Sequence, residues 1–180
     1  MPFIKSLPED AKLAELFKPR GTYYAPLLRF LENVMRGDSE LTPGEREMIA
    51  GYVSALNGCR YCEGGHREAA VALGVEPAMF DALKGDIETA AVDDRLKPIL
   101  NYARKLTKDP ESVTQADADA IAAAGWSEAT LSDVVNVCAI FNYFNRLVEG
   151  HGIVGIEAEF QARGALHAKA GYVAQYHDED

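Results

Sequence analysis

Apolar residues recur along the chain at steps of three and four, which is the period of an α-helix. This holds in one stretch after another, with Gly, Pro and capping residues between the stretches. Alternation of apolar and polar residues is nowhere long enough for a strand, and the apolar run at 152–155 is too short to be one. The pattern predicts an all-α fold.

Capping residues divide this pattern into helices. Ser6 and Thr42 each precede a glutamate by three residues, which is the capping box that opens a helix. Thr114 and Ser127 are further N-cap candidates, and Gly37 suits the left-handed residue that follows a helix. The expected helices run from the Ser6 box to about 18, and over about 24–36, 43–56, 59–73, 77–84, 93–107, from the Thr114 cap onward, 127–148 and 156–169.

Length and composition describe one ordinary globular unit. A chain of 180 residues fills one core well and is short for two domains. We therefore expect a single multi-helix bundle over residues 1–180. Hydrophobic residues make up 48% and charged residues 26%, and no apolar run approaches the roughly 18 residues of a membrane span.

Charge and cysteine content limit the expected partners and the expected cellular compartment. The net charge of −10 repels phosphate backbones, so we expect no nucleic-acid partner, and we expect no membrane partner. The first ten residues lack the basic start and apolar stretch of a signal peptide. Three cysteines, an odd number, favour a reducing compartment, and we expect a cytoplasmic protein.

The chemistry of the chain concentrates around two cysteines and a histidine. If this segment is helical, Cys59, Cys62 and His66 lie on one face. A neighbouring imidazole or a helix N-terminus can deprotonate a thiol, and a second thiol one turn away can close a disulfide with it. The arrangement indicates redox chemistry.

Glu47 is the candidate partner of the histidine. Its helical neighbours Gly51 and Ser54 are small, so this flank can receive the helix that carries His66. A carboxylate there would fix one imidazole tautomer and stabilise the imidazolium. The alternative is a surface glutamate in the first turn of a helix, which the helix dipole favours.

Together these residues resemble a known family. Glu47, Cys59, Cys62 and His66 at these spacings are similar to the motif of the alkylhydroperoxidase D-like proteins, within the carboxymuconolactone decarboxylase superfamily. The resemblance to its peroxidase-related branch extends over residues 34–37, 41–47, 56–62 and 141–147. It covers about 23–155, the expected core of the domain, and leaves a C-terminal helix and acidic tail at 156–180.

The resemblance implies an all-helical enzyme that reduces organic hydroperoxides without haem, other cofactor or metal. Cys62 would attack the peroxide and become a sulfenic acid, and Cys59 would donate a proton and then resolve that acid as a disulfide. His66 and Glu47 would relay protons. An external thiol or dithiol, either a small thiol or a lipoyl or thioredoxin-like protein, would reduce the disulfide. The family also implies a homo-oligomer, a trimer or hexamer.

One position departs from the family. Tyr61 stands where the best-known members have a histidine, and a tyrosine is a poor base near neutral pH. The relay would be shorter, and the activity slower or directed at another substrate. Asn145 is a supporting residue, one turn after Asn142; it would either hydrogen-bond substrate or satisfy buried backbone, and we favour the structural role. His167 has no partner that the sequence identifies.

Position and neighbours give different answers about which thiol reacts. If the helix starts at 57–58, Cys59 lies in its first turn, where the dipole lowers a thiol pKa from about 8.5. The imidazole one turn away favours Cys62 instead, and the resemblance assigns the peroxide-reactive role to Cys62.

Two other functions fit the same residues. Cys59, Cys62 and His66 are three zinc ligand types, but the sequence offers no second cluster for a structural site, which leaves catalytic zinc as a minor alternative. A general thiol–disulfide protein or sensor also fits the cysteine pair, although the thioredoxin context needs alternating strands and helices. A c-type haem is excluded because His66 does not directly follow Cys62.

Overall fold

The computed structural model describes residues 1–173, and this part of the chain is helical and contains no strand. Its helices are α1 Leu13–Phe17, α2 Gly21–Arg36, α3 Pro43–Leu56, α4 Arg60–Ala72, α5 Ala78–Ala82, α6 Leu96–Lys108, α7 Gln115–Ala123, α8 Glu128–His151 and α9 Glu157–Ala170, with 3-10 turns η1 Lys18–Arg20 and η2 Pro110–Ser112. The all-α prediction is confirmed. The predicted acidic tail at 177–180 lies outside the described residues.

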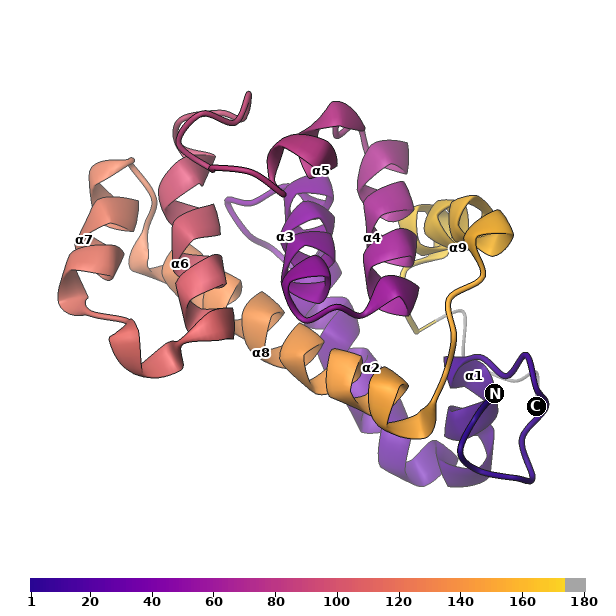
Figure 1. The fold of residues 1–180 in the computed structure, drawn as a ribbon. Coiled ribbons are helices and arrows are strands. Elements are labelled where there is room, and N and C mark those ends of the chain that lie inside the picture. Colours follow the sequence, from indigo (N-terminus) through magenta and orange to yellow (C-terminus); the bar gives the residue numbers. More distant parts are fainter. Residues whose placement is uncertain (174–180) are drawn as a thin grey trace.

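The antiparallel pair α3 and α4 forms the centre of the molecule (Figure 1). Helix α8 crosses below this pair, α6 and α7 lie on one side, and α9, α1 and α2 lie on the other. Helix α3 starts at the predicted Thr42 box, where the Thr42 hydroxyl accepts from the Glu45 N–H and the Glu45 carboxylate accepts from the Thr42 N–H. Most of its remaining side chains are buried, so α3 is the core helix on which the others pack.

Small residues let helices approach this centre closely. A Cβ at Gly51 would lie 2.9 Å from the Phe80 ring and 3.5 Å from the backbone nitrogen of Arg67 in α4. A Cβ at Gly164 of α9 would lie 2.6 Å from the backbone nitrogen of Ala69 in α4. The contact at Gly164 leaves no room for a side chain, and the α4 backbone is in van der Waals contact with the position at Gly51, so α4 packs closely between α3 and α9.

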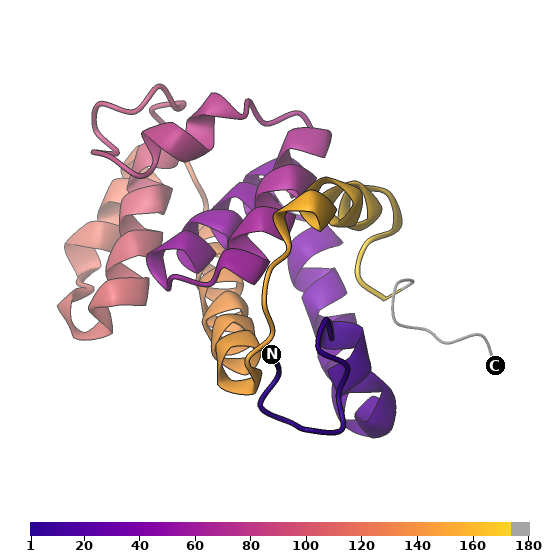
Figure 2. The ribbon, with the colours of Figure 1, turned by 45° about the vertical axis from the view of Figure 1, so that its right-hand side comes forward.

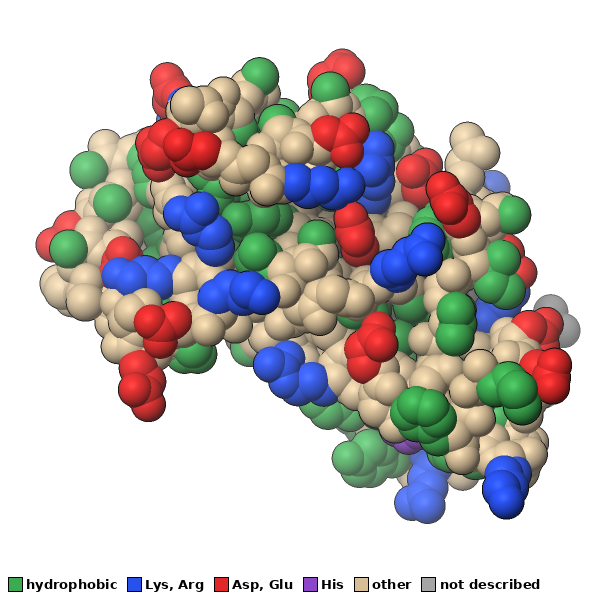
Figure 3. Space-filling view, in the orientation of Figure 1, with side chains coloured by type: hydrophobic (Ala, Val, Ile, Leu, Met, Phe, Trp, Pro, Cys, Tyr) green, Lys and Arg blue, Asp and Glu red, His purple; other side chains and the backbone are tan. Residues whose placement is uncertain are grey.

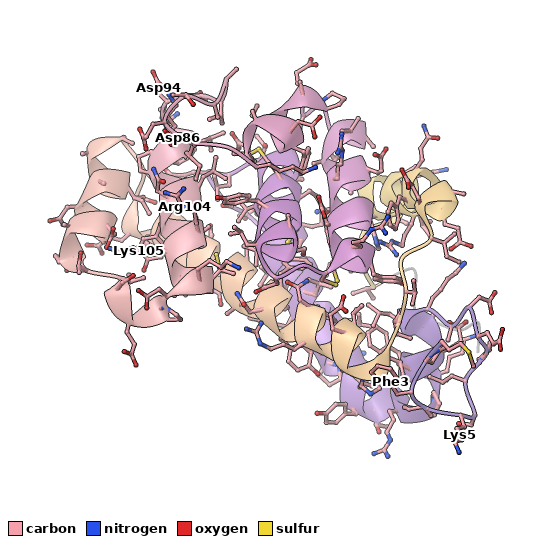
Figure 4. All side chains as sticks on the ribbon, in the orientation of Figure 1. Phe3, Lys5, Asp86, Asp94, Arg104 and Lys105 are labelled. Atoms are coloured by element: carbon pink, nitrogen blue, oxygen red, sulfur yellow. The ribbon has the colours of Figure 1, made fainter. Side chains whose placement is uncertain are left out.

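The N-terminal residues close one end of the bundle. The Phe3 N–H donates to the His151 carbonyl at 2.9 Å, and the Phe3 ring lies against Gly152. Figure 4 shows Phe3 beside the last turn of α8, and Figure 2 shows the N-terminus next to the segment that links α8 to α9. None of the described helices has the length and apolar character that crossing a bilayer requires.

Several predicted boundaries are wrong. The Ser6 box opens no helix: residues 6–9 form turns, and α1 begins only at Leu13, where Glu15 caps the Lys12 N–H. Gly37 has a φ of −64° and continues as extended chain rather than in the left-handed region. Helix α8 continues through Gly150 to His151, so His151 belongs to a helical turn and Gly152, with φ 67°, supplies the left-handed cap.

Candidate active site

Glu47 and His66 form the centre of the site. The Glu47 side chain is fully buried, and its Oε2 lies 2.6 Å from the His66 Nδ1. Helix α3 supplies the carboxylate and α4 the imidazole, and the contact of the two helices at Gly51 brings them together. The alternative of a surface glutamate is therefore wrong.

The second carboxylate oxygen of Glu47 is also occupied. Arg36 of α2 donates to Oε1 at 2.5 Å, and the Tyr172 hydroxyl donates to the same oxygen at 2.6 Å. Burial raises the pKa of Glu47, but the hydrogen bond and charge of His66 together with the charge of Arg36 outweigh it and lower the pKa to about 2. Glu47 is thus an ionised carboxylate with three protein donors.

The two thiols of α4 are buried and free. Cys59 is the N-cap of α4 and Cys62 lies in its first turn, so the expectation that Cys59 sits in the first turn is off by one residue. The hydrogen bond from the Cys59 thiol to Cys62, burial and the charge of Cys62 raise the pKa of Cys59. The expected lowering by the helix dipole is wrong, because contact with the second sulfur outweighs it.

Cys62 and His66 line a small pocket. Its volume is about 30 Å³, close to the share of one water molecule in the liquid. The walls come from α1, α2, α4, α8, α9 and the segment after α9, and are mostly apolar and aromatic: Leu13, Phe17, Leu28, Leu31, Tyr61, Cys62, His66, Phe141, Phe144, Arg163, His167 and Tyr172. Cys62 and His66 thus line one narrow, mostly apolar pocket.

His167 and Tyr172 are site residues that the sequence did not reveal. The His167 ring is parallel to the His66 ring, with 2° between the planes and 5.7 Å between centroids. Burial, reinforced by the charge of His66, lowers the pKa of His167 to about 3, so its imidazole is neutral at physiological pH. Both residues lie about 100 positions from the motif, and no spacing rule connects them to it.

Comparisons with known proteins agree with this picture. Residues 22–109 match the model of the carboxymuconolactone decarboxylase family. This segment belongs to that family. It contains Glu47, both α4 cysteines and His66, whereas His167 and Tyr172 lie beyond it. No curated protein matches the chain.

Two solved structures share the fold. An uncharacterised peroxidase-related protein from Silicibacter sp. TM1040 is 26% identical, with a TM-score of 0.76, over 84% of this chain and 79% of that one. An uncharacterised peroxidase-related protein from Ralstonia eutropha JMP134, described as an alkylhydroperoxidase AhpD core, is 27% identical, with a TM-score of 0.74, over 83% and 78%. The resemblance inferred from the motif is confirmed.

Tyr61, the departure from the family pattern, faces α1 and α9. Its hydroxyl accepts from the Leu13 N–H at 3.4 Å, and the Arg163 guanidinium lies 3.8 Å from its ring centroid. Burial raises the pKa of Tyr61, so the phenol keeps its proton at neutral pH. Tyr61 therefore forms part of the pocket wall and contacts α1 and α9 there, and it stays a neutral phenol.

Asn145 stabilises the turn before the dithiol. Its side-chain oxygen accepts from Asn57 at 2.8 Å, and its Nδ2 donates to the Ser54 hydroxyl at 3.0 Å. The backbone carbonyl of Ser54 in turn accepts from the Cys59 N–H at 3.0 Å. Asn145 therefore links α8 to the α3–α4 turn, and it does not line the pocket.

The arrangement of the side chains also bears on the alternative of a zinc site. Within residues 1–173, no three His, Cys, Asp or Glu side chains are grouped as a metal site. The Glu47 carboxylate is committed to Arg36, His66 and Tyr172. A metal held by Cys59, Cys62 and His66 would lack this carboxylate as a fourth ligand.

Proposed function

We propose that the chain is a thiol peroxidase of the alkylhydroperoxidase kind, which reduces hydroperoxides through the dithiol of α4. One observation carries the proposal: His66, whose Nδ1 lies 2.6 Å from the buried Glu47 carboxylate, lines the same pocket as Cys62. The family match and the peroxidase-related names of the two similar structures support this class of reaction.

The first step consumes the peroxide. The Cys62 thiolate attacks the outer peroxide oxygen, an S–O bond forms as the O–O bond breaks, and the alkoxide leaves as an alcohol with a proton from His66. Cys62 is oxidised to a sulfenic acid and the peroxide is reduced. Glu47 holds the imidazolium through Nδ1, which leaves Nε2 for proton transfer.

The second step closes the disulfide. Cys59 attacks the sulfur of the Cys62 sulfenic acid, an S–S bond forms, and water leaves with the Cys59 proton. The raised pKa of Cys59 keeps that proton in place until the sulfenic acid exists, so in this proposal His66 protonates the alkoxide, whereas the family resemblance implies that Cys59 does. An external dithiol then reduces the disulfide by exchange and becomes a disulfide itself.

Burial favours a small oxidant over a protein disulfide. Cys59 is 0% and Cys62 4% exposed, so the thiols of the resting protein are closed to a folded partner. Helix α1 supplies Leu13 and Phe17 to the pocket wall, and its displacement would admit a peroxide larger than water. This weighs against a general thiol–disulfide protein that uses the same cysteines.

Rapid mixing of the reduced protein with a panel of peroxides, with thiols counted before and after, tests the proposal. We expect loss of two thiols per oxidised chain, no peroxide consumption by Cys62→Ser, and one turnover with a trappable sulfenic acid for Cys59→Ser. Cys138→Ser is the matched control, because burial raises the pKa of Cys138 to about 12 and it lies outside the pocket. Steady turnover by Cys62→Ser would overturn the proposal.

A homo-oligomer, an external thiol or dithiol reductant, and a reducing, cytoplasmic setting belong to the same proposal. Light scattering of the purified protein would measure the number of subunits, for which we predict three or six. Reduction of the oxidised protein by a lipoyl protein, a thioredoxin-like protein or a small thiol would identify the donor by its rate.

A further inference from the structure

A second cavity lies on the other side of the α3–α4 pair. We call it the α3–α6 cavity; its volume is about 330 Å³, at the lower end of the roughly 300–1,000 Å³ typical of small-molecule sites. Its lining comes from α3, α4, α5 with the residues after it, and α6: Tyr52, Ala55, Leu56, Glu63, Phe80, Leu83, Lys84, Gly85 and Arg104. None of these residues lines the dithiol pocket.

The hydroxyl of Tyr52 is the unusual feature of this cavity. Tyr52 is only 4% exposed, and within residues 1–173 no group hydrogen-bonds its hydroxyl. Among the described residues the buried side-chain atoms without a partner are Arg46 Nε and Thr107 Oγ1, so the Tyr52 oxygen is not sealed in the core but open to the cavity, where a ligand can reach it. Burial raises the pKa of Tyr52 and the nearby positive charge of Arg104 opposes this, so a protonated donor stands beside a cation.

Arg104 is an exposed residue at the rim of this cavity and has no counter-ion in the described part of the chain. Its guanidinium donates to the Asn101 side-chain oxygen at 2.9 Å and pairs with no carboxylate. The neighbouring Lys105 differs, because it forms an ion pair with Asp117 of α7 at 2.7 Å. Figure 4 shows the two on α6, with Lys105 toward α7.

The rest of the wall is apolar apart from Glu63 and Lys84, and Lys84 forms an ion pair with Asp81 at 3.4 Å. Leu56, Phe80 and Leu83 cover the cavity between the polar groups, and Figure 3 shows apolar surface between α6 and the α3–α5 region with Lys and Arg side chains at its border. A few convergent donors in an apolar hollow are the usual make-up of a site for an amphipathic small molecule.

We propose that the α3–α6 cavity binds a small monocarboxylate with a compact apolar body. The carboxylate accepts from the Tyr52 hydroxyl and from the Arg104 guanidinium, whose planar donors match a carboxylate. The apolar body lies against Leu56, Phe80 and Leu83. Glu63 also lines the cavity and repels each negative charge of a ligand, so a second carboxylate lowers the affinity and monocarboxylates bind better than dicarboxylates.

Benzoate is the probe, and benzyl alcohol is its uncharged counterpart. In calorimetric or NMR titrations of the full chain, we expect benzoate to bind. Benzyl alcohol should bind at least roughly tenfold more weakly, since hydrogen bonds to a charged group contribute about 1.5–3 kcal/mol. Arg104→Gln and Tyr52→Phe should each weaken benzoate binding roughly tenfold or more. Phthalate, which carries two carboxylates, should bind more weakly than benzoate.

Lys105→Gln is the matched control, because it removes the same charge from the next residue of α6 and lies outside the cavity lining. It should leave benzoate binding unchanged. Cys62→Ser should also bind benzoate normally, so failure of the peroxidase proposal would not affect this one.

Circular dichroism confirms the fold of each variant, and unfolding in urea supplies a second measurement. Tyr52→Phe should leave the free energy of unfolding without benzoate unchanged within about 0.5 kcal/mol, because it removes a hydroxyl with no protein partner. A clear loss of stability would show that the fold itself uses the hydroxyl. Equal binding of benzoate and benzyl alcohol, or equal effects of Arg104→Gln and Lys105→Gln, would overturn the proposal.

Discussion

Helix α3 buries several polar side chains, and two of them, Glu47 and Tyr52, lie on different faces and differ in whether the fold supplies them with partners. Glu47 faces α4 and the C-terminal segment, and its carboxylate receives hydrogen bonds or ion pairs from Arg36, His66 and Tyr172. Tyr52, five residues later and roughly 140° around the helix, faces the α3–α6 cavity and has no partner in the described residues.

The difference follows from what each group costs when it is left unpaired. A buried carboxylate without counter-charge is penalised by several kcal/mol, so the fold must surround it with donors. A neutral hydroxyl at a cavity is penalised far less. The Glu47 face of α3 therefore suits proton transfer between fixed groups. The Tyr52 face suits reversible binding of a ligand.

The largest expected effect on the free energy of unfolding comes from neutralising Glu47. Glu47→Gln removes the charge that balances Arg36 and His66, and breaking a buried ion pair from one side costs about 3–5 kcal/mol. Urea unfolding followed by circular dichroism would measure it. Glu45→Gln, a change of the same kind at the cap of the same helix, should cost about 1 kcal/mol or less. Similar losses for the two variants would contradict the special position of Glu47.

A smaller effect on the free energy of unfolding is expected when the two tyrosines are each replaced by phenylalanine. Tyr172→Phe removes a 2.6 Å hydrogen bond to an ionised carboxylate and should lower the free energy of unfolding by about 1.5–3 kcal/mol. Tyr52→Phe makes the same chemical change on the other face and should cost almost nothing. The two variants in one urea series test the comparison, and a larger loss for Tyr52→Phe would reverse it.

The last effect is a change in pH dependence, which is small at any one pH near neutrality and grows as the pH falls. Burial lowers the pKa of His167 from 6.5 to about 3, so between these values the unfolded chain binds a proton that the folded chain does not. Stability therefore falls as pH drops from 6.5 toward 3, by at most about 1.4 kcal/mol per pH unit from this group. His167→Gln should flatten this part of the stability profile.

His151→Gln is the control for that measurement. His151 is half-buried at the end of α8 and lies outside the dithiol pocket. Its replacement should leave the slope between pH 6.5 and 4.5 as in the wild type. Below about 4.5, Glu47, whose pKa is lowered to about 2, adds a loss of its own that remains in both histidine variants. An unchanged slope in His167→Gln would show that His167 titrates normally.

Local sequence predicted those parts of the site that a single helix or helix pair defines. The spacing of Cys59, Cys62 and His66 places them along one edge of α4, and the small residues after Glu47 correctly marked the face on which α4 packs. The Thr42 box fixed the start of α3 because its partners are three residues apart. The Ser6 box also has a hydroxyl residue three positions before a glutamate, but it opens no helix.

What the sequence determined by itself was the helical class, the start of the central helix and the dithiol with its histidine, because each depends on contacts a few residues apart. Only the tertiary structure decided that Arg36, His167 and Tyr172 surround Glu47, and that Tyr52 faces a cavity beside Arg104. These groups meet through packing of α2, α6 and α9 on the central pair. Hydrophobic periodicity specifies which face of a helix is buried, but not which distant side chain it will meet.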